Sequence, residues 1–305
     1  MNTQEWALII FTILTEMSVG SFLVLGTVHF FVERKAGLKE ADRMSDGVLI
    51  AIVVALGLGM LASLFHLGNP LNAYKAVTNI GGSALSREIL SGVTFAVLAL
   101  LFVALQWFKV GSARLRDVVA LVTAVVGVVF VYFQSRIYML ATQPSWNTPL
   151  TTVTFYASTL LLGVLAIGAA LVANCAVIQR KNPDCAETQS KMLRGAIRWI
   201  AIASIFLCGI QIIVTPIYLA YLGTGPAAAQ ASLAKMAGEF NLAFILRMVL
   251  GFLGAVVLAV FLYQNATTSG QKFLGKLAYG AFALVLIAEV LARFVFYATH
   301  VGIGI

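Results

Sequence analysis

The chain has 305 residues, of which 61% are hydrophobic and only 10% are charged, and its mean hydropathy is +0.96. A soluble domain has a much lower apolar fraction, so this composition excludes a soluble enzyme and predicts an all-α integral membrane protein. The formal charge of +8 does not indicate nucleic-acid binding, because the basic excess lies in short loops between apolar segments, where orientation signals belong.

Eight apolar segments are long enough to cross a bilayer, which takes about 20 residues per helix. We place these eight transmembrane helices at residues 6–32, 47–67, 87–108, 117–141, 150–179, 195–222, 241–264 and 273–300. Because no polar domain separates them, residues 1–305 are expected to form a single membrane domain. The first segment lacks the basic leader of a signal peptide, so we expect it to be retained as a span.

The loops between the spans differ in their content of Lys and Arg. The loops after the first, third, fifth and seventh spans hold thirteen such residues, and the other loops hold two. Since basic loops remain in the cytoplasm, we expect both termini to be extracytoplasmic in a bacterial cytoplasmic (inner) membrane.

The connection between the second and third spans carries an ionisable residue on each side of a Gly-rich loop. His66 closes the second span and Glu88 opens the third, one turn after Ser86, which we expect to be the helix N-cap. A neutral imidazole with a pKa of about 6.5 can take a hydroxyl proton, and a nearby carboxylate can accept or relay a second one. We therefore predict His66 and Glu88 as catalytic residues, although His66 alone would also suit a hydrogen-bonded residue at the membrane surface.

Further charged residues lie in the extracytoplasmic halves of several spans. Charges inside a membrane usually face the protein interior, where they pair with one another or line a wet site. Glu289 and Arg293 are four residues apart, which puts them on one helical face in the favourable acid-first order. Together with two tyrosines, these residues form the predicted quinone-binding set: Glu16, Arg136, Tyr138, Arg247, Glu289, Arg293 and Tyr297. The alternative is that the Glu and Arg residues form structural ion pairs.

Two other features of the sequence leave narrower choices. Gln211, Thr215 and Pro216 fit either a kink that lines a cavity or a helix-packing surface. The three cysteines form no CxxC pair and are too few for an iron–sulfur cluster, which needs about four thiolates. Two of the three histidines are expected at one side of the membrane and the third at the other. We therefore expect no haem and no metal in this protein.

Two stretches resemble the membrane-anchor subunit of the dimethyl sulfoxide reductase family, namely HLGNP followed by SALSREI, and the closing segment EVLARFVFYATH. The resemblance implies a menaquinol site without haem, in which His66 and Glu88 match the family's quinol-site residues. It also implies two partners: a four-cluster ferredoxin-like iron–sulfur subunit with 4Fe–4S clusters, and a molybdopterin catalytic subunit with a molybdenum (or tungsten) bis-pterin. The related polysulfide-reductase anchors imply two four-helix bundles, made of spans 1–4 and 5–8.

The resulting hypothesis is a subunit that oxidises menaquinol on the extracytoplasmic side and passes the electrons to the iron–sulfur partner. The terminal substrate chemistry would lie in another subunit. Three alternatives stay open: the same complex working as a quinone reductase, a purely structural anchor, and a secondary transporter. A transporter would normally show broken helices near the middle of the membrane and polar groups that reach both sides.

Overall fold

A computed structural model describes residues 3–66, 79–181, 183–268 and 270–303, and the side chains of residues 3, 4, 66 and 183 lie outside what it describes. All regular elements in these ranges are helices, and eight helical segments are long and apolar enough to span a membrane. The predicted all-α membrane class with eight transmembrane helices is thereby confirmed.

The helices follow the apolar segments closely, with two additions. Their bounds are α1 Thr3–Ala36, α2 Leu38–His66, α3 Ala84–Trp107, α4 Ala113–Arg136, α5 Pro149–Lys181, η2 Pro183–Cys185, α6 Ala186–Thr224, α7 Ala227–Ala237, α8 Asn241–Phe252, η3 Leu253–Val257, α9 Leu258–Asn265 and α10 Gln271–Ala298. The seventh span is α8, η3 and α9 in series, because five residues take π-helical geometry. The short helix α7 lies where the sequence suggested only a loop.

Local sequence explains where several helices begin and end. Gly37, with φ of 84°, separates α1 from α2, and its amide donates to the Glu33 carbonyl at 2.8 Å, as a glycine after a helix C-terminus does. Helix α5 begins at Pro149, a residue whose fixed φ suits the first helical position. Helix α4 ends at Arg136, five residues before the predicted end of the fourth span, so Tyr138 lies in the following turn.

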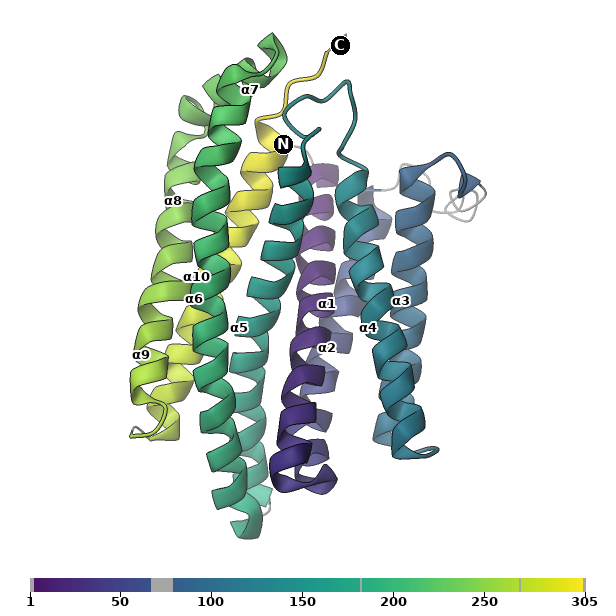
Figure 1. The fold of residues 1–305 in the computed structure, drawn as a ribbon, viewed down its shortest axis with the longest axis vertical. Coiled ribbons are helices and arrows are strands. Elements are labelled where there is room, and N and C mark those ends of the chain that lie inside the picture. Colours follow the sequence, from purple (N-terminus) through teal and green to yellow (C-terminus); the bar gives the residue numbers. More distant parts are fainter. Residues whose placement is uncertain (1–2, 67–78, 182, 269, 304–305) are drawn as a thin grey trace.

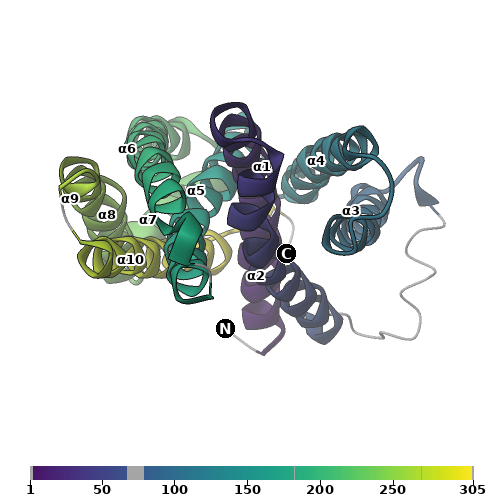
Figure 2. The same cartoon turned by 90° about the horizontal axis from the view of Figure 1, so that it is seen from below.

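The spans fall into two groups joined by α1 and α5. Helices α5, α6, α8–α9 and α10 pack together on one side, whereas α3 and α4 form a pair on the other (Figure 2). Helix α1 packs along both α2 and α5 at the centre. The last four spans thus form a compact bundle, while α3 has few close contacts with α2.

Helix α1 begins and helix α10 ends at the same end of the molecule, which we call the terminal end (Figure 1). Helix α7 and the loop at residues 137–148 lie at this end as well (Figure 1). The polar residues inside the bundle are found on the halves of the helices nearest to it.

Candidate functional site

A buried ion pair joins the first and last helices. The Arg293 guanidinium donates to the Glu16 carboxylate, and the two residues are only 4% and 0% exposed. The same guanidinium lies over the Phe155 ring of α5, 3.5 Å from its centroid, which adds a cation–π contact. Arg293 therefore ties α10 to α1 and α5, and does not pair with Glu289 on its own helix as its spacing suggested.

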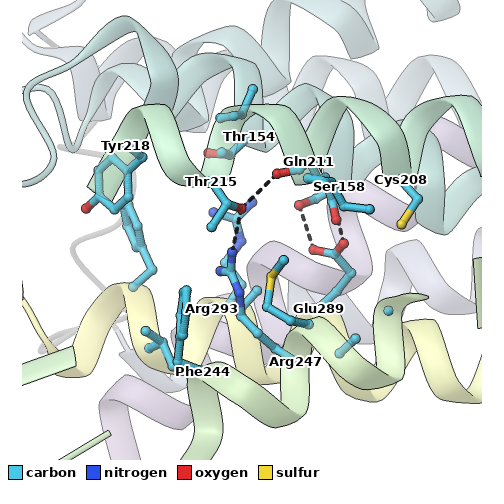
Figure 3. Close-up of a pocket in the computed structure, with 18 of the residues that line it drawn as sticks. Thr154, Ser158, Cys208, Gln211, Thr215, Tyr218, Phe244, Arg247, Glu289 and Arg293 are labelled. Carbon is cyan, nitrogen blue, oxygen red and sulfur yellow. Dashed lines mark hydrogen bonds between the residues drawn. The ribbon is translucent and has the colours of Figure 1, made fainter. Parts of the chain in front are cut away.

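Glu289 makes its contacts with α5 and α6. Its carboxylate oxygens accept hydrogen bonds from the Ser158 hydroxyl and from the Gln211 side-chain amide, each at 2.7 Å (Figure 3). Glu289 is 4% exposed. A buried carboxylate is costly unless it is hydrogen-bonded, so these two donors explain how the acid is accommodated between three helices.

A cavity of about 100 Å³ lies beside Glu289, enclosed by α5, α6, α8 and α10, with Met236 of α7 at its terminal end. Glu289, Arg247 and Arg293 contribute charged groups to its wall, and Gln211, Thr215 and Tyr218 contribute polar groups (Figure 3). Three phenylalanines and two methionines form much of the remaining surface: Phe244, Phe252, Phe296, Met236 and Met248. The site thus combines a few polar groups with aromatic walls, which is usual for small-molecule pockets.

Arg247 is the least restrained cation of this cavity. Its guanidinium donates to the Thr215 hydroxyl at 3.4 Å and lies 5.2 Å from the Phe244 ring centroid. No carboxylate of the described residues forms an ion pair with it. Of the two interpretations of Gln211 and Thr215 in the sequence, the cavity-lining one is correct, because both side chains line this pocket.

Tyr138 and Tyr297 connect the two halves of the protein at the terminal end. Their hydroxyl groups are 2.7 Å apart in one hydrogen bond, and both side chains are buried. Burial, together with the neighbouring Tyr297 phenol and Glu88 carboxylate, raises the pKa of Tyr138 well above its usual value. Tyr138 therefore stays a neutral phenol, which can hold a hydrogen bond but does not supply a phenolate.

Glu88 is 6% exposed in the second turn of α3. The expected N-cap was wrong, because Ser83 caps this helix by accepting from the Ser86 amide at 3.2 Å. Of two serines three residues apart, the one nearer the loop takes the cap, so the helix starts a turn earlier than predicted. Among the described residues no cation pairs with Glu88. The side chain of His66, the last residue of α2, lies outside the described part of the protein.

The structure divides the predicted site residues among three places. Glu16 and Arg293 form the central ion pair, Arg247 and Glu289 line the cavity, and Tyr138 links Glu88 to Tyr297. Arg136 stands apart from all three, because its side chain is exposed and donates to the Met139 sulfur at 3.4 Å.

Ser158 is a site residue that the sequence did not indicate. A serine within an apolar helix usually bonds to its own backbone, so nothing in its surroundings along the sequence distinguishes it. Its role follows only from the packing of α5 against α10, which brings its hydroxyl to Glu289.

The fold has a counterpart among solved structures. The bd oxidase from Geobacillus thermodenitrificans aligns with a TM-score of 0.57 and 11% sequence identity, over 96% of this chain and 84% of that one. At this identity the likeness concerns the arrangement of the helices alone.

Sequence comparison gives closer relatives, all of them subunits of anaerobic dimethyl sulfoxide reductases. The protein is 28% identical to one such subunit of Haemophilus influenzae, over 100% of its own length and 98% of that subunit. It is also 28% identical to the subunit of the same name in Escherichia coli, over 99% and 96% of the two lengths. The E. coli subunit YnfH is 34% identical over 55% of this protein and 58% of its own length. The family model described as DMSO reductase anchor subunit (DmsC) matches residues 1–299, and the protein therefore belongs to the DMSO reductase anchor subunit family.

Proposed function

We propose that this membrane anchor of a molybdoenzyme complex oxidises menaquinol at its terminal end and delivers the electrons to an iron–sulfur subunit. The observation that carries the proposal is Glu88: a buried carboxylate, near the neutral phenol of Tyr138, without a described counter-ion. It is separated by a single loop from His66, at the end of α2. A structural ion pair would need a cation at this place.

The residues of this corner fit the chemistry of a hydroquinone. A bound quinol supplies two electrons and two protons. His66 and Glu88 are the proton acceptors, because an imidazole and a carboxylate can each take a hydroxyl proton. Tyr138 stays protonated and keeps Tyr297 in position through their hydrogen bond. Its phenol orients its neighbours and takes no proton itself.

The direction of transfer follows from the proposed orientation. The opposite end carries the basic loops, so the terminal end would face away from the cytoplasm. A four-cluster ferredoxin-like iron–sulfur subunit docked there, next to a molybdopterin subunit with a molybdenum (or tungsten) bis-pterin, would receive electrons without their crossing the bilayer. Protons would leave on the same side, so turnover would be electroneutral.

The test uses the whole complex in its membrane with dimethyl sulfoxide as the acceptor. In Glu88→Gln, and separately in His66→Gln, the rate with a reduced naphthoquinol should fall by roughly 100-fold or more, as expected for loss of a proton acceptor. The rate with reduced viologen, which feeds the iron–sulfur subunit directly, should remain unchanged in both variants.

Glu187→Gln is the matched control, because Glu187 is exposed at the start of α6, at the opposite end. It should leave both rates unchanged. If the Glu88 and His66 variants assemble and still oxidise the naphthoquinol at the wild-type rate, the redox proposal fails and a structural anchor takes its place. Reduction of a naphthoquinone by the complex, without net quinol oxidation, would reverse the proposed direction.

A further inference from the structure

The cavity beside Glu289 is separate from the Glu88 corner. Its wall comes from the last four spans and α7, and includes neither Glu88 nor Tyr138. Two buried acids and two arginines surround it, because Glu16 and Arg293 pair just behind the wall while Glu289 and Arg247 line it. The formal charges cancel, so the pocket suits an uncharged ligand with polar atoms more than an ion.

Hydrogen-bonding capacity remains free at this wall. Arg293 lines the cavity and is 4% exposed, yet its Nε–H has no partner among the described residues. A buried donor without a partner costs about 1–3 kcal/mol, so a ligand or water oxygen is expected there. Arg247 has only its long bond to Thr215. Donors are therefore available for oxygen atoms of a ligand, and the Glu289 carboxylate is available as an acceptor.

The cavity has a closed floor. On the side away from the terminal end, the Ser204 hydroxyl of α6 donates to the Ala255 carbonyl of η3 at 3.1 Å. At the same level, η3 touches α10 so closely that a Cβ on Gly254 would lie 2.8 Å from Val285. The sixth, seventh and eighth spans therefore meet below the cavity.

The cavity opens sideways instead. Helix α6 packs against η3 and α9, but it makes hardly any close approach to α8. Ile212 of α6 and Phe252 of α8 both line the cavity, and they are nevertheless 41% and 46% exposed. Residues that face both the pocket and the exterior of a span mark an opening toward lipid, since these surfaces lie within the membrane-spanning segments.

We propose that this cavity is a second site, which binds the uncharged headgroup of a lipid-soluble p-quinone or its hydroquinone, entering between α6 and α8. The ring would lie among Phe244, Phe252 and Phe296. Its two oxygens would find donors in the arginines and an acceptor in Glu289, and an isoprenoid tail would leave through the gap into the bilayer.

The experiment is photolabelling of the intact complex in lipid nanodiscs with an isoprenylated azidonaphthoquinone, followed by peptide mapping. Label is expected on residues 211–218 of α6 and 244–252 of α8, and an excess of menaquinone should lower it at least tenfold. Gly251→Leu should abolish this label, because Gly251 lines the cavity beside Ala288 and the larger side chain would occupy the ligand space. Arg247→Gln should reduce it at least tenfold.

Two control variants and one cross-test complete the design. Gly57→Leu makes the same replacement on an exposed face of α2 with no neighbour within 4 Å, and Arg198→Gln removes an exposed arginine that bonds only to Tyr263. Both should label like the wild type. Viologen-driven turnover should be normal in every variant, which shows that the complex is assembled.

Label confined to α2 and α3 would overturn the proposal, and so would α6–α8 label that menaquinone does not displace, because the occupant would then be a phospholipid tail. Glu88→Gln should retain the α6–α8 label. The second site can therefore stand when the proposed catalytic corner fails, and it can fail when that corner stands.

Discussion

Gly20 of α1 and Gly163 of α5 meet with their backbones in contact. A Cβ on Gly20 would lie 1.8 Å from the Thr159 carbonyl oxygen, and one on Gly163 would lie 2.2 Å from the carbonyl carbon of Gly20. Small residues allow such close approach between membrane helices. Because α1 and α5 hold the two groups of spans together, this contact sets how the halves of the protein fit.

We expect Gly20→Ala to destabilise the protein strongly. Overpacking typically costs about 1–3 kcal/mol, and here the obstacle is backbone that cannot rotate aside, so the cost should lie at the upper end. Thermal unfolding of the complex in detergent measures it. Gly26→Ala on the same helix has open space around it and should leave the melting temperature unchanged. Equal melting temperatures for the two variants would contradict the contact.

The spans were predictable from the sequence because each is a run of about 20 apolar residues, a signal that needs no knowledge of packing. The breaks were not. The π-helical turn at Leu253–Val257 lies in an apolar run like any other, and α7 is short and alanine-rich. Both depend on contacts with neighbouring helices, which a hydropathy pattern does not contain.

The candidate site was predictable as a group of residues but not as a set of pairs. The charged residues stood out because charges in a membrane span are costly. Their partners did not, because the spacing of Glu289 and Arg293 describes an isolated helix surface, whereas in the folded bundle each reaches a different helix. Arg136 looked equivalent to Arg247 by depth, but helix rotation leaves it exposed.

The ion pair of Glu16 and Arg293 gives a second prediction. Glu16→Gln should cost about 3–5 kcal/mol, because it leaves a buried guanidinium without its counter-charge. The double variant Glu16→Met with Arg293→Met should be more stable than Glu16→Gln, since both charges are then removed from the interior. Denaturant or thermal unfolding of the assembled complex compares them. A double variant less stable than the single one would show that the pair contributes net stability.

The hydroxyl groups of Tyr138 and Tyr297 form one bond, so their removal should not be additive. Tyr138→Phe and Tyr297→Phe should each cost about 1 kcal/mol, and the double variant should cost clearly less than the sum. A double-mutant cycle of unfolding free energies measures the coupling. Additive costs would mean that each hydroxyl has a more important partner elsewhere.

Lys109 fastens the α3–α4 pair to α2 at the end opposite the termini. Its backbone has φ of 53°, and its ammonium donates to Asp42 at 2.8 Å and to Asp46 at 2.9 Å. Lys109→Met should leave the two carboxylates repelling each other, with only Gln106 as a shared donor. Because the lysine is 42% exposed, the loss of stability should be about 1 kcal/mol or less.

The local effect should be clearer than the global one. Amide hydrogen exchange at residues 105–116 should speed up in Lys109→Met, since α3 makes few other contacts with α2. Lys276→Met, on an exposed face of α10, is the control and should leave exchange in this region unchanged. Unaltered exchange in both variants would show that packing alone holds the pair.

The start of α3 separates two serines by their roles. Ser83→Ala should cost about 1 kcal/mol, because the Ser86 amide loses its capping acceptor at the beginning of the helix. Ser86→Ala should cost far less, because the cap uses the backbone amide of that residue and not its hydroxyl. Exchange rates of the amides at residues 84–88 distinguish the two, and faster exchange is expected only in the Ser83 variant. The reverse order would move the cap to Ser86 and place Glu88 in the first turn, where the helix dipole would stabilise its anionic form.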